Sequence, residues 1–93
     1  HAYPNAAAEV VALWFGEGDF DRTAHIIAMA GQDVDCNAAQ ILTVIGVLRS
    51  IKGIDSRWRD PIGDTLQTYM RRERKLSIRR LAARTAAAAK KSQ

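Results

Sequence analysis

The chain has 93 residues, of which 47% are apolar, and this length allows one small domain at most. Its one cysteine excludes an internal disulfide, and no signal peptide is visible at the N-terminus. The longest uncharged run, Cys36 to Leu48, is 13 residues long and too short to span a bilayer. We therefore expect no membrane contact and a reducing, cytoplasmic location.

The net charge of +4 hides an uneven distribution along the chain. Residues 1–70 carry five Lys/Arg against nine Asp/Glu, a net charge of −4. Residues 71–93 carry nine Lys/Arg against a single glutamate, a net charge of +8. The basic character therefore belongs to the C-terminal quarter alone.

Hydrophobic periodicity predicts an all-α fold of about four helices and no strand. We predict helices over residues 6–15, 20–30, 37–52 and 78–90. Their expected caps are Asn5, Asp19 and Ser77, and their expected stops are Gly16, Gly31 and Gly53. The first and third helices are apolar nearly all round, so we expect a larger all-α core, another chain or a second copy to cover them.

This pattern divides the chain 1–93 into three parts of one domain. Residues 1–53 form a helical core, residues 54–76 an irregular connection with short helices, and residues 77–93 a basic C-terminal helix. We expect Trp58 and Ile62 to anchor the connection, which Pro61 interrupts.

The most informative stretch lies before the third predicted helix and reads Gly-Gln-Asp-Val-Asp-Cys-Asn over residues 31–37. Asp33 and Asp35 stand two residues apart, and such carboxylates in a turn can hold a hard cation such as Mg²⁺, Mn²⁺ or Ca²⁺. The plainer alternative makes Asp35 a helix cap and leaves Asp33 in solvent. A calcium loop is excluded because its sixth position is Ala38 and its twelfth is Val44, where glycine and glutamate are required.

Several segments, in order, resemble the C-terminal part of the ADP-ribosylglycohydrolases. The start His-Ala-Tyr-Pro-Asn is followed by Gly-Glu-Gly-Asp-Phe at residues 16–20 and by the motif at residues 31–37, similar to the family's Gly-x-Asp-Thr-Asp-(Thr/Ser/Cys)-Asn. Gly-Ile-Asp-Ser-Arg-Trp at residues 53–58, Asp-Thr-Leu at 64–66 and Ser-Ile-Arg-Arg-Leu-Ala at 77–82 continue the resemblance.

The resemblance implies an orthogonal assembly of helices around a two-metal centre that holds Mg²⁺ or Mn²⁺. Enzymes of this family cleave the glycosidic bond that links ADP-ribose to an acceptor, which is a protein side chain or a small molecule. Carried over by position, Asp33, Asp35 and Cys36 become metal ligands, and Asn37 becomes a contact to the substrate.

The sequence also departs from the family pattern. Val34 replaces a threonine, Cys36 offers a sulfur that suits Mg²⁺ poorly, and Leu42 and Ser50 replace glycines. The family's other ligands, a Thr/Ser-Asp-Asp cluster, lie in an N-terminal region with no counterpart here. We therefore expect a C-terminal segment that is inactive alone and needs that region or another chain.

Other functions stay open. A thiol nucleophile would pair Cys36 with His25, but no third group orients them. The basic residues near the C-terminus could bind nucleic acid or contact the acidic part of the same protein, but a solvated helical face is the favoured interpretation. Because Tyr69 is the one stacking aromatic nearby and no DNA-binding motif fits, we do not expect a nucleic-acid partner. The alternative to a hydrolase segment is thus a non-catalytic helical module that binds ADP-ribose, a partner or nucleic acid.

Overall fold

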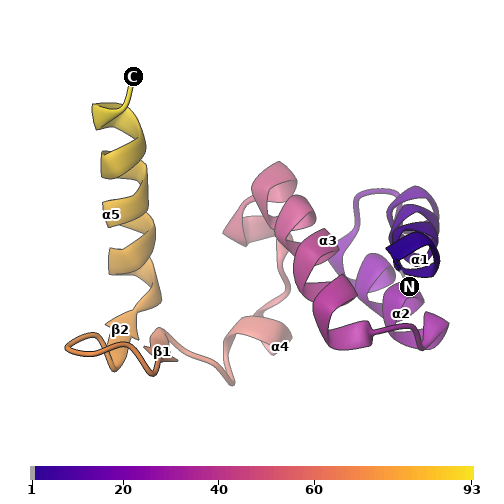
Figure 1. Ribbon diagram of the computed structural model, residues 1–93, viewed down its shortest axis with the longest axis horizontal. Helices are drawn as coiled ribbons and strands as arrows, with labels where there is room; N and C mark the ends of the chain where they lie inside the picture. The colour runs from indigo at the N-terminus through magenta and orange to yellow at the C-terminus, as the bar shows by residue number, and fades with distance from the viewer. Residues whose placement is uncertain (1) are drawn as a thin grey trace. The chain divides into compact units, whose positions relative to one another are not determined.

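A computed structural model describes residues 2–93, and 68% of the chain is helical, which confirms the all-α fold class. The elements are α1 (Ala2–Gly16), α2 (Phe20–Ala30), α3 (Val34–Arg49), the 3₁₀ turn η1 (Ile51–Gly53), α4 (Ser56–Arg59), β1 (Thr65–Gln67), β2 (Lys75–Ser77) and α5 (Ile78–Lys91). They form two compact units, residues 1–58 and residues 59–93, which we describe separately (Figure 1).

The first unit is a three-helix assembly in which α1, α2 and α3 all contact one another (Figure 1). Its core is small and consists of Ala12 from α1, Ile27 from α2, and Ile41 and Ile45 from α3, all buried. Because few large side chains meet there, the helices depend on close backbone approach as well as on apolar burial.

The closest approach joins the C-terminal end of α1 to α2. Gly16 is buried, and a Cβ atom added to it would lie 2.1 Å from Oγ1 of Thr23. The chain then turns through Glu17 and Gly18, which both have positive φ, at 54° and 76°. Gly16 therefore ends α1 as predicted, but its function is to admit α2, and the left-handed turn follows it.

The start of α1 was predicted four residues too late. The helix begins at Ala2, so Pro4 lies in its first turn and Asn5 lies inside it, and the prediction of Asn5 as a cap is wrong. Proline is tolerated there because the N–H groups of a first turn have no intrahelical partner.

The predicted ends of α2 are confirmed. The backbone N–H of Arg22 donates to Oδ2 of Asp19 at 2.8 Å, and Gly31 closes the helix in a left-handed conformation with φ 68°. In contrast, α3 ends at Arg49, three residues before the predicted end. Ser50 has φ 63°, and Gly53 ends the 3₁₀ turn η1 that follows.

Trp58 anchors the connection after α3 as predicted. Its ring packs edge-on against Phe20 with centroids 5.8 Å apart, and its Nε1–H donates to Oδ1 of Asp21. The guanidinium of Arg57 donates to the other carboxylate oxygen of Asp21 at 2.5 Å. The predicted anchoring by Ile62 is wrong, because that side chain is exposed.

The second unit holds a short antiparallel hairpin, which the prediction of no strand missed. β1 and β2 pair Thr65 with Ser77, Leu66 with Leu76 and Gln67 with Lys75. Strands of three residues are too short to show a periodicity of two, so the sequence carries no clear signal for them. As predicted, Ser77 caps the last helix, since its Oγ accepts the N–H of Arg80 at 3.2 Å.

Large apolar side chains of the first unit remain exposed. They lie mainly on α1 and α3 and include Val10, Trp14, Phe15, Val44, Val47 and Leu48. Residues 2–93 therefore do not bury these helices themselves, and the expected cover by a larger core, another chain or a second copy stays a prediction. No helix within these residues is long and apolar enough to cross a membrane.

Candidate metal centre

The loop between α2 and α3 presents its acidic residues through two left-handed backbone positions. Gly31 has φ 68° and Asp33 has φ 41°, after which α3 begins at Val34. Aspartate tolerates this conformation better than most residues do. The two positions reverse the chain direction within a few residues and leave Asp33 and Asp35 at the exposed start of α3.

Three ligand-type side chains converge at this place. One carboxylate oxygen from each of Asp33 and Asp35 and the sulfur of Cys36 all lie within 4.8 Å of one another. Among residues 2–93 this is the one group of three or more His, Cys, Asp or Glu residues so arranged. The predicted convergence of the two carboxylates is therefore present in the structure.

The alternative of a plain helix cap does not describe this loop. Asp35 lies inside the first turn of α3, and the cap position belongs to Asp33. The Asp33 carboxylate makes no capping hydrogen bond to the helix. Neither carboxylate is thus used in a capping hydrogen bond, although the Cys36 thiol hydrogen-bonds to Asp33, and the positive end of the α3 dipole stabilises their negative charge.

The donor set fits a hard cation in part. Carboxylate oxygens suit Mg²⁺ and Mn²⁺, and small side-chain rotations would bring two oxygens at this spacing onto one ion. The thiol of Cys36 fits such an ion poorly because sulfur is a soft ligand. Two carboxylates fill only part of an octahedral shell, so a complete centre needs further ligands.

The electrostatics of the loop act on Cys36. The negative charge of Asp33, and then that of Asp35, raises the pKa of the Cys36 thiol above its ordinary value. The thiol is exposed and forms no disulfide, and its raised pKa keeps it protonated at neutral pH. His25 lies on an exposed part of α2 and does not belong to the cluster, so the structure gives the thiol no general base.

Asn37 holds the loop in place through hydrogen bonds. Its side chain is buried, and its Nδ2 donates to the carbonyl of Gln32 at 2.7 Å and to Oδ1 of Asn5 at 3.4 Å. These bonds tie residues 31–37, which we call the metal-motif loop, to α1. The role predicted for Asn37, contact with the substrate, stays a prediction.

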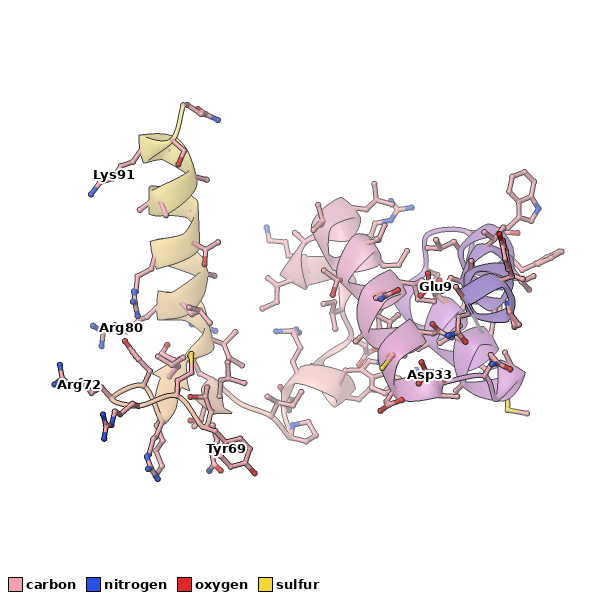
Figure 2. All side chains as sticks on the ribbon, viewed as in Figure 1. Glu9, Asp33, Tyr69, Arg72, Arg80 and Lys91 are labelled. Carbon is pink, nitrogen blue, oxygen red and sulfur yellow. The ribbon has the colours of Figure 1, made fainter. Side chains whose placement is uncertain are left out.

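An open depression of about 280 Å³ lies beside two of the three ligand-type residues, Asp33 and Cys36. It is lined by Ala2, Asn5, Ala6, Glu9, Asp33, Cys36, Asn37 and Gln40. Figure 2 labels Glu9 on α1 and Asp33 on the loop. The sequence prediction did not include Glu9, which lies four residues after Asn5 on the same face of α1.

Comparison with known proteins decides what this loop belongs to. The model of the ADP-ribosylglycohydrolase family matches residues 1–93, the whole chain. The chain belongs to the ADP-ribosylglycohydrolase family. No curated protein and no solved structure matches it. The resemblance inferred from the motifs is confirmed, and the carboxylates of this family member lie inside the matched segment.

Proposed function

We propose that this chain contributes Asp33 and Asp35 as ligands to a Mg²⁺ or Mn²⁺ centre that hydrolyses the bond between ADP-ribose and an acceptor. The observation that carries the proposal is the convergence of the two carboxylates within 4.8 Å, with no capping hydrogen bond from the Asp33 side chain. Family membership supports the reaction class.

In this proposal the metal, when bound, polarises the distal ribose and a water molecule next to the scissile glycosidic bond. Asp33, just before α3, and Asp35, in its first turn, supply negative charge and oxygen ligands at a fixed position. Asn37 holds the loop against α1, so the carboxylates keep their geometry. Cys36 takes the place of a hydroxyl ligand and would be a weaker donor to such an ion.

The depression beside the carboxylates gives the ribose a place to bind. Its wall includes the polar side chains of Asn5, Glu9 and Gln40, which can exchange hydrogen bonds with hydroxyl groups. Because two carboxylates leave the coordination of two metals incomplete, we propose that these residues are inactive until further ligands join them. A cytoplasmic location fits the free thiol of Cys36.

The test measures binding of ADP-ribose by calorimetry with Mn²⁺ and again with EDTA. We expect heat of binding only with Mn²⁺, and its loss in Asp33→Asn and Asp35→Asn. Asp60→Asn, which makes the same charge change outside the loop, serves as the control. Equal binding with and without metal would instead favour the second candidate, a non-catalytic relative that binds ADP-ribose through polar contacts alone.

A further inference from the structure

The second unit carries a concentration of positive charge that the proposed hydrolase centre does not use. Residues 59–93 hold ten Lys/Arg against three Asp/Glu, a net charge of +7. Of the basic residues from Arg71 onward, only Arg84 lies within ion-pair distance of a carboxylate, that of Glu73 at 3.7 Å. Arg79 also interacts electrostatically with the Asp64 carboxylate, and the remaining basic side chains of this set are available to an anionic partner.

The fold gathers these charges on one surface. Figure 2 shows Arg72 from the hairpin loop, and Arg80 and Lys91 from α5, extending to the same side of this unit. From Arg80 to Lys91 the helix rises roughly 16 Å, so these charges extend along the axis of α5. A cavity of about 280 Å³ between the hairpin and α5 is lined by the basic residues Lys75, Arg80 and Arg84, by Glu73, and by Leu76, Ser77 and Leu81.

The hairpin loop that begins this surface has a defined shape. The N–H of Thr68 donates to the carbonyl of Arg74 at 2.8 Å, and the N–H of Glu73 donates to that of Met70 at 3.2 Å. Oγ1 of Thr68 also accepts the N–H of Met70 at 3.1 Å. These bonds present Tyr69 fully to solvent, without a packing partner that would explain an aromatic ring.

We infer that the hairpin and α5 form a binding surface for single-stranded nucleic acid. Arginine forks bind phosphate in a bidentate manner, and an exposed tyrosine offers a base a surface for stacking. A lipid surface fits less well, because the outer positions of α5 are alanines rather than the large apolar residues that insert into membranes. The sequence alone favoured a solvated helical face. The placement of the charges on one side of this unit and the exposed ring of Tyr69 favour a nucleic-acid partner instead.

The probe is a fluorescein-labelled oligouridylate of about 16 nucleotides, and its anisotropy is followed over a range of KCl concentrations. The double variant Arg72→Asn/Arg80→Gln removes two charges, and asparagine suits the positive φ of 68° at residue 72. We expect affinity to fall on the order of tenfold and the salt slope to decrease by about 1.4. Arg22→Gln/Lys52→Gln is the control with the same charge change in the first unit, and it should bind as the parent chain does.

The stacking contribution has its own variants. Tyr69→Ala should weaken binding by about fivefold or more, and Tyr69→Phe should retain it. Circular dichroism confirms that each variant folds. Equal losses in both double variants, or full affinity in Tyr69→Ala, would overturn the proposal. Tighter binding to phosphatidylserine-containing vesicles than to the oligonucleotide would overturn it too, and would assign the surface to a membrane.

Discussion

Gly16 and Thr23 lie so close that a Cβ atom on Gly16 would come within 2.1 Å of the Thr23 hydroxyl oxygen. This crossing fixes α1 against α2, and it sets the position of Asn5, which hydrogen-bonds to Asn37 of the metal-motif loop. A small core leaves the domain dependent on such close contacts.

Gly16→Ala should therefore lower the free energy of unfolding by about 1–3 kcal/mol, because the helices must separate to admit the methyl group. Gly46→Ala is the matched control: no atom lies within 4 Å of its added Cβ, and it should raise stability by about 0.5–1 kcal/mol. Urea unfolding measures both. A neutral Gly16→Ala would show that the crossing is loose.

Thr23 carries a buried hydroxyl with no hydrogen-bond partner. Replacing this oxygen with a methyl group in Thr23→Val removes an unsatisfied polar atom, so stability should rise by about 1 kcal/mol. Thr43→Val is the comparison. The Thr43 hydroxyl donates to the carbonyl of Ala39 at 2.6 Å, so its removal should not raise the stability. A destabilised Thr23→Val would mean that the hydroxyl has a partner in solution.

The reactivity of Cys36 reports the electrostatics of the loop. Asp33 makes the largest contribution to its raised pKa, so Asp33→Asn should lower that pKa and increase the thiolate fraction at a given pH. Alkylation by iodoacetamide in EDTA at about pH 8 should be faster in Asp33→Asn than in the parent chain. The control Asp60→Asn should react at the rate of the parent chain. An unchanged rate in Asp33→Asn would show that the Asp33 carboxylate does not lie beside the thiol.

Asp64 links the hairpin to α5. Its carboxylate accepts the Ser77 hydroxyl and the N–H of Arg79 at 2.9 Å, and these hydrogen bonds lower its pKa below the ordinary value. A pKa lowered by folding stabilises the folded state above the unfolded value of 3.8, and that stability is lost as the pH falls through the lowered value.

The start of α5 should therefore lose helicity in acid. Asp64→Asn should lose part of this helicity already at neutral pH, because the amide accepts more weakly and cannot carry the charge. Far-ultraviolet circular dichroism during an acid titration of both proteins measures the difference. Identical titration curves would contradict the link between Asp64 and α5.

Much of this fold could be predicted because local chemistry decides it. Asp19, Gly31 and Ser77 cap or end helices through their own side chains or backbone freedom, and the structure has them as predicted. The prediction of Asn5 as a helix cap failed because its side chain makes a tertiary contact. It accepts a hydrogen bond from Asn37, 32 residues away. The hairpin of residues 65–77 was missed because its strands are too short for a pattern.

The candidate site also combines residues that local sequence predicts with residues that only tertiary packing brings in. Asp33 and Asp35 stand out in the sequence by their spacing and their family motif. Glu9 carries no such signal, because only the packing of α1 against the loop brings it to the depression. The partners of the exposed apolar residues on α1 and α3 cannot be read from local pattern at all.

Binding of Mn²⁺ tests most directly whether Asp33 and Asp35 are metal ligands. Electron paramagnetic resonance of the free ion measures this binding. The parent chain and Asp60→Asn should remove Mn²⁺ from solution, and Asp33→Asn and Asp35→Asn should each lose this binding. Mn²⁺ binding that survives in Asp33→Asn/Asp35→Asn, or that is lost equally in Asp60→Asn, would contradict the assignment of the metal centre to this loop.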